Sequence, residues 1–277
     1  CDPGRKLLGF VDLKRLVTAP LDEKIGDLMD ENVVSVKADV DQEEAADIIR
    51  HYDLIALPVV DRDAKLVGIV TFDDIMDIVE EEYNEDVQLQ AAVVPAEIDY
   101  LDQSPTDLIK RRLVWLVALL FAETGGVLLL KNYEGFLEAQ IALALFLPVM
   151  IATGGNTGTQ SAALVIRAIA TGDVKLPDAG RILLREFVVS AGLATMLGAL
   201  AYGLVLLIEG DPMTAACIGV GLATIVTISN IAGTILPLIL EKIKLDPALL
   251  SGPFISTLID VLGLVIYLEI SGAILGF

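Results

Sequence analysis

Five apolar segments in the second half of the chain constrain its fold more than any other feature. Each is close to or longer than the ~20 residues that cross ~30 Å of hydrocarbon as a helix. Proline and glycine interrupt them, which membrane helices tolerate because neighbouring helices satisfy the freed backbone groups. The sequence therefore predicts an all-α transmembrane domain over residues 111–277, with helices at about 113–130, 140–166, 186–208, 213–240 and 249–271.

Lysine and arginine predict how these helices are oriented. The basic residues near the ends of the segments are Lys110, Arg111, Arg112, Arg167, Lys175, Arg181, Arg185, Lys242 and Lys244. They precede the first segment or lie in the loops 2–3 and 4–5, whereas the opposite loops carry only Lys131. By the positive-inside rule, the N-terminal half is cytoplasmic and the C-terminus is outside. We therefore expect a multi-pass protein of the cell membrane.

The first 110 residues differ from the rest in charge. They hold 27 of the 39 acidic residues and 10 of the 19 basic ones, within a formal net charge of −20. This acidity argues against nucleic-acid binding, which needs a basic surface. The chain begins with Cys1, and LLGFVDLKRLV at 7–17 repeats the pattern of LVGIVTFDDIM at 66–76. We therefore expect a fragment of a longer protein, with residues 1–24 the remnant of a first module.

Residues 25–82 are predicted to form a complete α+β module, ordered helix–strand–helix–strand–strand–helix. Apolar residues recur at helical spacing in QEEAADIIRHYD, ALPVVD is typical of a short buried strand, and LVGIVTFDDIMDIVE indicates a strand followed by a helix. This pattern resembles the CBS domain, a regulatory module that usually occurs in pairs. The resemblance implies an adenine nucleotide as a candidate ligand, near Thr71, Asp73 and Asp74.

Acidic residues crowd the end of this module. They are Asp73, Asp74, Asp77, Glu80, Glu81, Glu82, Glu85 and Asp86. On one helix, several would form like-charge pairs four residues apart, each slightly destabilising. One interpretation is a solvated acidic face. The other is a sensor in which Mg²⁺ bridges carboxylates and relieves their repulsion.

Two polar features lie inside apolar segments. The run PVMIATGGNTGTQSA at 148–162 indicates a broken or polar-lined helix beside a pathway, since polar groups in hydrocarbon must face protein or water. Asp260 falls at the midpoint of the last segment, and no lysine or arginine lies inside any of the five. Asp260 therefore has no basic partner for an ion pair. Its carboxyl group is either protonated or bound to a cation in a pathway, and we favour the cation. Ser256 and Gly252 share its helix face.

The module and the five segments together resemble the MgtE family of magnesium channels and transporters. The motif TGGNTGTQSAALVIRAIATGD at 153–173 is similar to the family's second span, and DPALLSGPFISTLIDVLGLVIYL at 246–268 to its last. The resemblance implies a homodimer whose second and fifth spans line a central pore. Two positions depart from the family pattern, because Thr159 and Gly252 each stand where asparagine is usual.

The resemblance also implies roles for individual residues and for the connecting segment. The pore residues implied are Asp260, Asn156, Thr159, Ser256, Gly252 and Glu138, and the regulatory metal ligands are Asp53, Asp74, Asp77, Glu82, Glu85, Asp86 and Asp246. Segment 83–110 corresponds to the connecting, or plug, helix. Because Pro95 and Pro105 disfavour one continuous helix, we expect it to be short or kinked.

The predicted function is import of Mg²⁺ down its electrochemical gradient. Cytosolic Mg²⁺ bound to the acidic residues would hold the pore closed. Two alternatives stay open. A Na⁺- or H⁺-coupled Mg²⁺ exchanger would share these features, and a membrane-anchored nucleotide sensor that transports nothing would leave Asp260 unexplained. An enzyme is not expected, since the single histidine, His51, has no nucleophile pattern around it, and we identify no catalytic residue.

Overall fold

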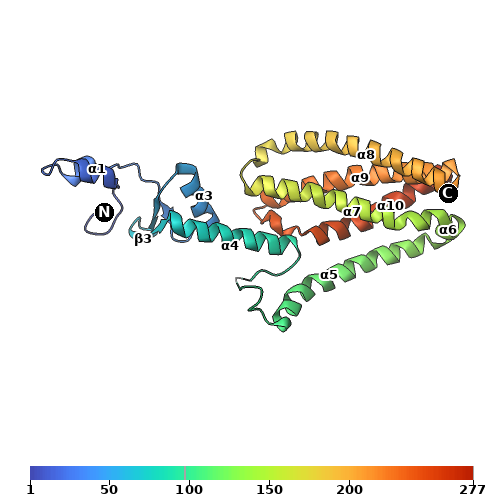
Figure 1. Cartoon of the computed structure of the whole chain (residues 1–277), viewed down its shortest axis with the longest axis horizontal. Helices are drawn as coiled ribbons and strands as arrows, with labels where there is room; N and C mark the ends of the chain where they lie inside the picture. The colour runs from blue at the N-terminus through green and yellow to red at the C-terminus, as the bar shows by residue number, and fades with distance from the viewer. Residues whose placement is uncertain (97, 277) are drawn as a thin grey trace. The chain divides into compact units, whose positions relative to one another are not determined.

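The computed structural model describes residues 1–96 and 98–276 (Figure 1). Two compact units make up the chain, Cys1–Glu85 and Asp86–Phe277, and each is described by itself. The first is a small α/β unit and the second is a bundle of long helices. This confirms the predicted fold class, an α+β module followed by an all-α membrane domain.

A three-stranded mixed sheet forms the centre of the first unit. Strand β1 (Val36–Lys37) pairs parallel with β2 (Ala56–Val60), which pairs antiparallel with β3 (Leu66–Thr71). The hairpin between β2 and β3 closes on Asp61, whose carboxylate accepts hydrogen bonds of 2.9 Å from the backbone N–H groups of Asp63 and Lys65. Aspartate favours turns because its side chain can bond the backbone in this way.

Two helices complete the core of the module. Helix α3 (Gln42–Tyr52) begins at Asp41, which accepts a hydrogen bond from the backbone of Glu43, and α4 (Phe72–Gln90) follows β3 directly. The buried core residues of the module are Val36, Ala45, Ala46, Ile49, Leu57 and Ile75. Strand and helix thus follow in the predicted order, starting from the short α2 (Ile25–Leu28).

The residues before the module have little buried surface. Helix α1 (Leu13–Thr18) and α2 contain no buried residue. Isolated bridges pair Lys6 with Lys65 and Phe10 with Asp30. In the repeat predicted at 7–17, Phe10 forms a β-bridge and helix α1 follows it. This order matches the second copy of the repeat, in which α4 follows strand β3.

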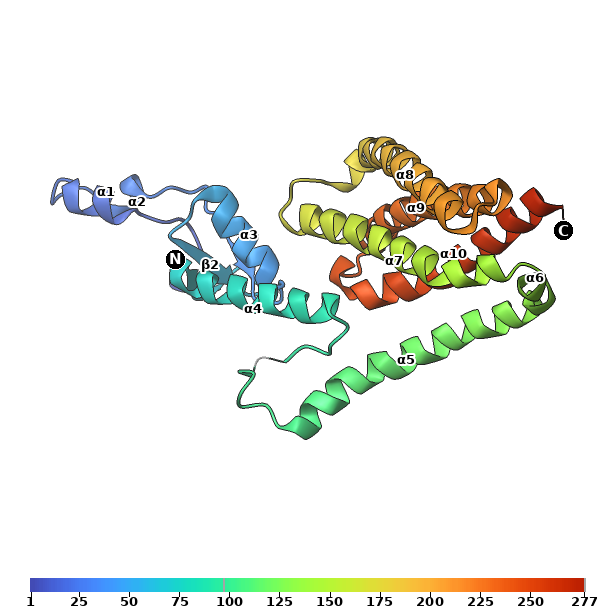
Figure 2. The same cartoon turned by 45° about the vertical axis from the view of Figure 1, so that its right-hand side comes forward.

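The second unit contains five helices long and apolar enough to cross a membrane, counted among the described residues. Their bounds are α5 (Pro105–Asn132), α7 (Ile141–Ala170), α8 (Ala179–Glu209), α9 (Pro212–Lys242) and α10 (Gly252–Leu275), with the short α6 (Glu134–Ala139), η1 (Leu176–Asp178) and η2 (Pro247–Leu249) between them. Figure 2 shows α5 separate from the other long helices over much of its length.

Helix α5 begins earlier than the apolar pattern predicts. Pro105 occupies its first turn and Ser104 caps it, accepting a 3.2 Å hydrogen bond from the backbone N–H of Asp107. The first turns therefore include the basic residues that precede the apolar segment. Helix α4 ends at Gln90, and the described residues between it and α5 form no helix. The connecting segment is thus not one continuous helix.

Helix α9 packs against α7, α8 and α10, whereas α5 contacts chiefly α10. Glycines allow the closest approaches. A Cβ added at Gly233 on α9 would lie 2.3 Å from the carbonyl oxygen of Gly158 on α7, and one added at Gly198 on α8 would lie 2.8 Å from that of Gly219. Small residues at such crossings let membrane helices associate by close van der Waals packing.

Candidate ion pathway

The contact between α7 and α10 contains the polar residues predicted to form a pathway. Gly155 on α7 faces Ser256 and Asp260 on α10, because a Cβ added at Gly155 would lie 2.5 Å from Ser256 Oγ and 3.2 Å from Asp260 Oδ1. Ser256 and Asp260 are one helical turn apart, as their spacing predicts. The second and fifth long helices therefore share a polar site midway along their length.

Asp260 has an unusual environment for a carboxylate. Its Oδ1 atom is buried and has no hydrogen-bond partner among the described residues. Its carboxyl group interacts with Glu123 on α5, a like-charged neighbour. A buried charged group normally has a partner, because removing a carboxylate from water is costly. The arrangement therefore contains a buried acceptor atom to which a hydrated cation or a water molecule can bind.

The start of α10 meets α7 at the two positions that depart from the family pattern, Gly252 and Thr159. Thr159 Oγ1 donates a 3.4 Å hydrogen bond to the carbonyl oxygen of Gly252. A Cβ added at Gly252 would lie 3.2 Å from Thr159 Cγ2 and 3.7 Å from the carbonyl oxygen of Gln90, the last residue of α4. The end of α4 thus lies beside the start of α10.

Helix α7 continues unbroken through the polar run. The side chains of the run lie in different environments. Asn156 and Gln160, one turn apart, are exposed on the single chain. Thr157 is buried and donates its hydroxyl hydrogen to the carbonyl of Thr153 in its own helix. Glu138 is exposed in α6, three residues before α7 begins.

A buried polar network joins α7 to α9 and α8. Ser161 Oγ lies 2.8 Å from Thr234 Oγ1 and 3.1 Å from the carbonyl oxygen of Asn230. Asn230 Nδ2 donates to Glu186 on α8, at 3.0 Å to Oε2 and 3.1 Å to the carbonyl oxygen. Ser161 therefore contributes to helix packing rather than to the α7–α10 site. Sequence reasoning missed Asn230 and Glu186, since neither lies in a recognisable motif.

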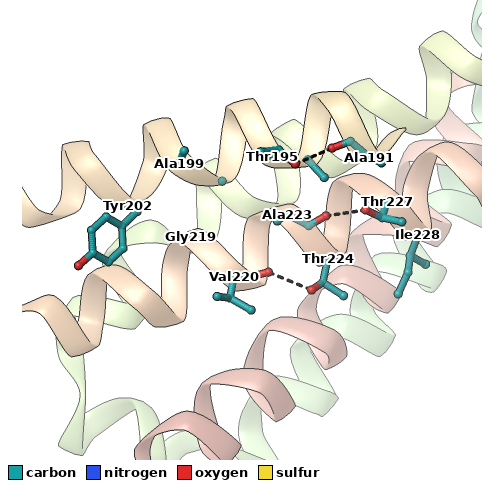
Figure 3. Close-up of a pocket in the computed structure, with 12 residues that line it drawn as sticks. Ala191, Thr195, Ala199, Tyr202, Gly219, Val220, Ala223, Thr224, Thr227 and Ile228 are labelled. Atoms are coloured by element: carbon teal, nitrogen blue, oxygen red, sulfur yellow. Dashed lines mark hydrogen bonds between the residues drawn. The ribbon is translucent and has the colours of Figure 1, made fainter. Parts of the chain in front are cut away.

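A groove of about 590 Å³ lies between α8 and α9 (Figure 3). It is lined by small side chains and by three threonines, each of which bonds a carbonyl in its own helix: Thr195 to Ala191, Thr224 to Val220 and Thr227 to Ala223. The polar groups of these threonines are therefore already satisfied. The groove lies away from Asp260 and presents an apolar surface.

The predicted regulatory acids lie on several elements. Asp53 ends α3 in the left-handed conformation, Asp77 is exposed on α4, Glu82 on α4 accepts a 2.7 Å hydrogen bond from Gln42, and Glu85 and Asp86 follow on α4. Asp246 caps η2 and accepts a 2.8 Å hydrogen bond from the backbone N–H of Ala248. Among the described residues, no three His, Cys, Asp or Glu side chains are grouped so that they could hold a metal ion.

Asp74 has a local structural role at the start of α4. It accepts hydrogen bonds from the hydroxyl and the backbone N–H of Thr71, at 2.7 and 2.8 Å, and these bonds lower the pKa of Asp74 below its usual value. Asp73, the third residue predicted to lie near a nucleotide, is exposed beside it. The bond between Thr71 and Asp74 fixes the turn from strand to helix at the edge of the module.

Arg111 on α5 holds together the end of α4 and the non-helical residues that follow it. Its guanidinium group donates to the carbonyl oxygen of Val94 at 2.5 Å, to Gln103 Oε1 at 2.5 Å and to Gln88 Oε1. Gln88 belongs to α4, whereas Arg111 belongs to α5. A guanidinium group presents five donors in a rigid fork, so it can hold several acceptors in one arrangement.

The fold and site define a class of protein, a multi-pass membrane protein with an acidic intramembrane site and a small α/β module before the helices. Residues 147–270 match the family model MgtE, described as a divalent cation transporter, and residues 25–81 match the CBS domain model. The chain therefore matches the MgtE family over residues 147–270, and MgtE is a family of transporters and not of enzymes.

Three relatives named magnesium transporter MgtE support this assignment. The chain is 40% identical to the protein of Thermus thermophilus over 99% of its own length and 61% of the relative's. It is 36% identical to that of Enterococcus faecalis and 37% identical to that of Bacillus subtilis, over 98% of its own length and 59% of theirs. The chain thus spans about three fifths of the length of these relatives.

Two solved structures also resemble part of the chain. The soluble part of a magnesium transporter matches 29% of the chain and 32% of that structure at 43% identity, with a TM-score of 0.29. The cytosolic domain of the Mg²⁺ channel MgtE in complex with ATP matches 28% of the chain and 32% of that structure at 41% identity, with a TM-score of 0.28.

Proposed function

We propose that this chain conducts Mg²⁺ across the cell membrane, with Asp260 in the ion pathway. The observation that supports the proposal most strongly is the buried, unpartnered Oδ1 atom of Asp260 at the contact between α7 and α10. A carboxylate in a membrane helix marks an ion or proton pathway more often than a packing site. Mg²⁺ keeps most of its water shell, so Ser256 and Asp260 need contact only those waters.

The pathway is completed by a second copy of the chain. Asn156 and Gln160 are exposed on the apolar helix α7 of the single chain. If their amide side chains faced lipid, their hydrogen-bonding groups would have no partner. Pairing two copies through α7 and α10 would cover these amides and place two Asp260 carboxylates near one axis. The polar face of α7 and the family resemblance both favour this homodimer, with Thr159 and Gly252 at one end and Glu138 near the other.

Regulation by Mg²⁺ is proposed for the acidic residues of the module and the connecting segment. Asp53, Asp74, Asp77, Glu82, Glu85, Asp86 and Asp246 are carboxylates, which are the ligands that Mg²⁺ prefers. Because no three of the described acids are grouped, a bound ion would draw its ligands from separate elements or from two copies. Such a site is sensitive to conformation, so Mg²⁺ would favour one arrangement of the chain. We place the connecting segment, residues 83–110, between this sensor and the pathway.

The end of α4 supports this coupling. Gln90 lies next to Gly252 at the end of the α7–α10 pair, and Arg111 joins α4 to α5 through Gln88. A displacement of α4 would therefore reach both the pathway helices and the first span. In the orientation that the basic loops predict, the N-terminus is cytoplasmic and Mg²⁺ enters from the side of the C-terminus. An adenine nucleotide at Thr71, Asp73 and Asp74 is proposed only as an additional ligand of the module.

The test is Mg²⁺ uptake into proteoliposomes that contain the chain, Asp260→Asn or Asp22→Asn. Asp22 is exposed in the first unit, so Asp22→Asn is a matched control for the loss of one carboxylate. We expect uptake by the parent and by Asp22→Asn, and a large loss in Asp260→Asn at equal protein insertion. Equal uptake by all three would remove Asp260 from the pathway. Uptake that requires an opposing Na⁺ or H⁺ gradient would instead indicate an exchanger.

A further inference from the structure

Helix α5 meets α10 at the level of Asp260. Gly126 is buried on α5, and a Cβ added there would lie 3.8 Å from Cγ2 of Val261, the neighbour of Asp260. Glu123 precedes Gly126 by three residues, so it lies on the same face of α5. As the first and fifth spans, the two helices cross in the same direction, and both carboxylates lie on the same side of this contact.

The neighbourhood of Asp260 contains no compensating cation. No lysine or arginine occurs in 113–130, 140–166, 186–208, 213–240 or 249–271. Glu123 and Asp260 interact with each other, and Asp260 Oδ1 has no hydrogen-bond partner among the described residues. Two adjacent carboxylates in a medium of low dielectric constant repel each other strongly. A proton or a cation that the two carboxyl groups share relieves this repulsion.

We propose that Glu123 is a specificity-determining residue of the pathway, which forms with Asp260 a carboxylate pair that favours divalent over monovalent cations. One Mg²⁺ neutralises both charges, whereas one Na⁺ leaves a net negative charge that repels the other carboxylate. Glu123 is exposed on α5, so the rest of the single chain does not enclose its carboxylate. This inference rests on the proposed function, because it concerns which ion passes Asp260.

Glu123 and Asp260 have different roles in this proposal. Asp260 lies at the α7–α10 contact and is proposed to be needed for passage of any ion. Glu123 comes from α5, which contacts α10 and little else in the bundle. Replacing Glu123 is therefore expected to change the preference among ions more than the total flux.

The test measures Mg²⁺ and Na⁺ uptake in parallel into proteoliposomes containing the parent, Glu123→Gln, Glu123→Asp or Glu134→Gln. Glu134 is exposed at the start of α6 and provides a matched control. We expect the ratio of Mg²⁺ to Na⁺ uptake to fall several-fold in Glu123→Gln. The ratio should be retained in Glu123→Asp, which keeps the charge, and in the control. Elution of all four proteins as one species in gel filtration confirms that they are folded.

Two outcomes would overturn the inference while leaving the proposed function intact. The first is Mg²⁺ uptake by the parent with the same ion ratio in Glu123→Gln. The second is a loss of both fluxes in equal proportion, which indicates a structural role for Glu123. Absence of Mg²⁺ uptake by the parent would instead contradict the proposed function, and with it the inference that depends on it.

Discussion

The crossing of α7 and α9 at Gly233 leads to a prediction about stability. Alanine at this position would place its Cβ 2.3 Å from the carbonyl oxygen of Gly158 and 3.2 Å from the backbone N of Ala162. Backbone atoms cannot rotate away, so the two helices must separate by about 1 Å to restore a normal contact. Overpacking of this kind costs roughly 1–3 kcal/mol. Each kcal/mol lowers the ratio of folded to unfolded protein by a factor of about 5.

The matched control for Gly233→Ala is Gly192→Ala, on α8. A Cβ added at Gly192 meets nothing within 4 Å. Alanine is favoured over glycine in a helix by about 1 kcal/mol at either position, so this gain cancels when the two variants are compared. We expect Gly233→Ala to unfold at a lower denaturant concentration or temperature than Gly192→Ala in the same detergent. Equal stability of the two variants would refute the close approach of α7 and α9.

Three further substitutions test the site, the connecting segment and the module. Gly155→Ala brings a methyl group 2.5 Å from Ser256 Oγ and 3.2 Å from Asp260 Oδ1, so Mg²⁺ uptake should fall while thermal stability changes little, because the Ser256 side chain can rotate; unchanged uptake would argue against a pathway at this contact. Arg111→Gln breaks the bonds from α5 to Val94 and Gln103, and we expect weaker inhibition of uptake by cytosolic-side Mg²⁺ with an unchanged maximal rate; inhibition equal to that of the parent would contradict this. The pKa of Asp74 is lowered in the folded protein by its bonds to Thr71, so its contribution to stability is present above the ordinary value of 3.8 and is lost as pH falls through the folded pKa. Thermal unfolding of Asp74→Asn between about pH 5 and pH 3 should therefore depend less on pH than that of the parent, and identical pH profiles would refute it.

The membrane helices could be predicted because their signal is local. Each apolar segment is long enough to be recognised by itself, and basic residues mark the loops between them. The start of α5 could not be predicted from hydropathy, since Ser104 and Pro105 set it through capping and not through apolar character. The connecting segment shows a similar limit, because Pro95 and Pro105 indicate an interruption but not that Arg111 joins its parts.

The polar site could be predicted only in part. A run of polar residues on a helix indicates that something polar faces it, but consecutive residues point in different directions. Gly155 faces Asp260, whereas Ser161 faces α9, and no sequence pattern separates the two. Asn230 and Glu186 are 44 residues apart, and this pairing depends on how α8 and α9 pack. Composition identified Asp260 as exceptional, but its contact with Glu123 required the tertiary structure.

The most direct test of passive Mg²⁺ conduction past Asp260 is the extent of accumulation under a fixed membrane potential. An inside-negative potential of about −100 mV is worth about 4.6 kcal/mol for a divalent ion. At about 1.4 kcal/mol per tenfold change, it drives Mg²⁺ to a limiting ratio on the order of 10³. We predict that proteoliposomes containing the parent approach this ratio without any Na⁺ or H⁺ gradient, that Asp260→Asn does not within the same time, and that collapsing the potential releases the accumulated ion. Accumulation by Asp260→Asn at the rate of the parent, or none by the parent unless a second ion gradient is imposed, would contradict the account.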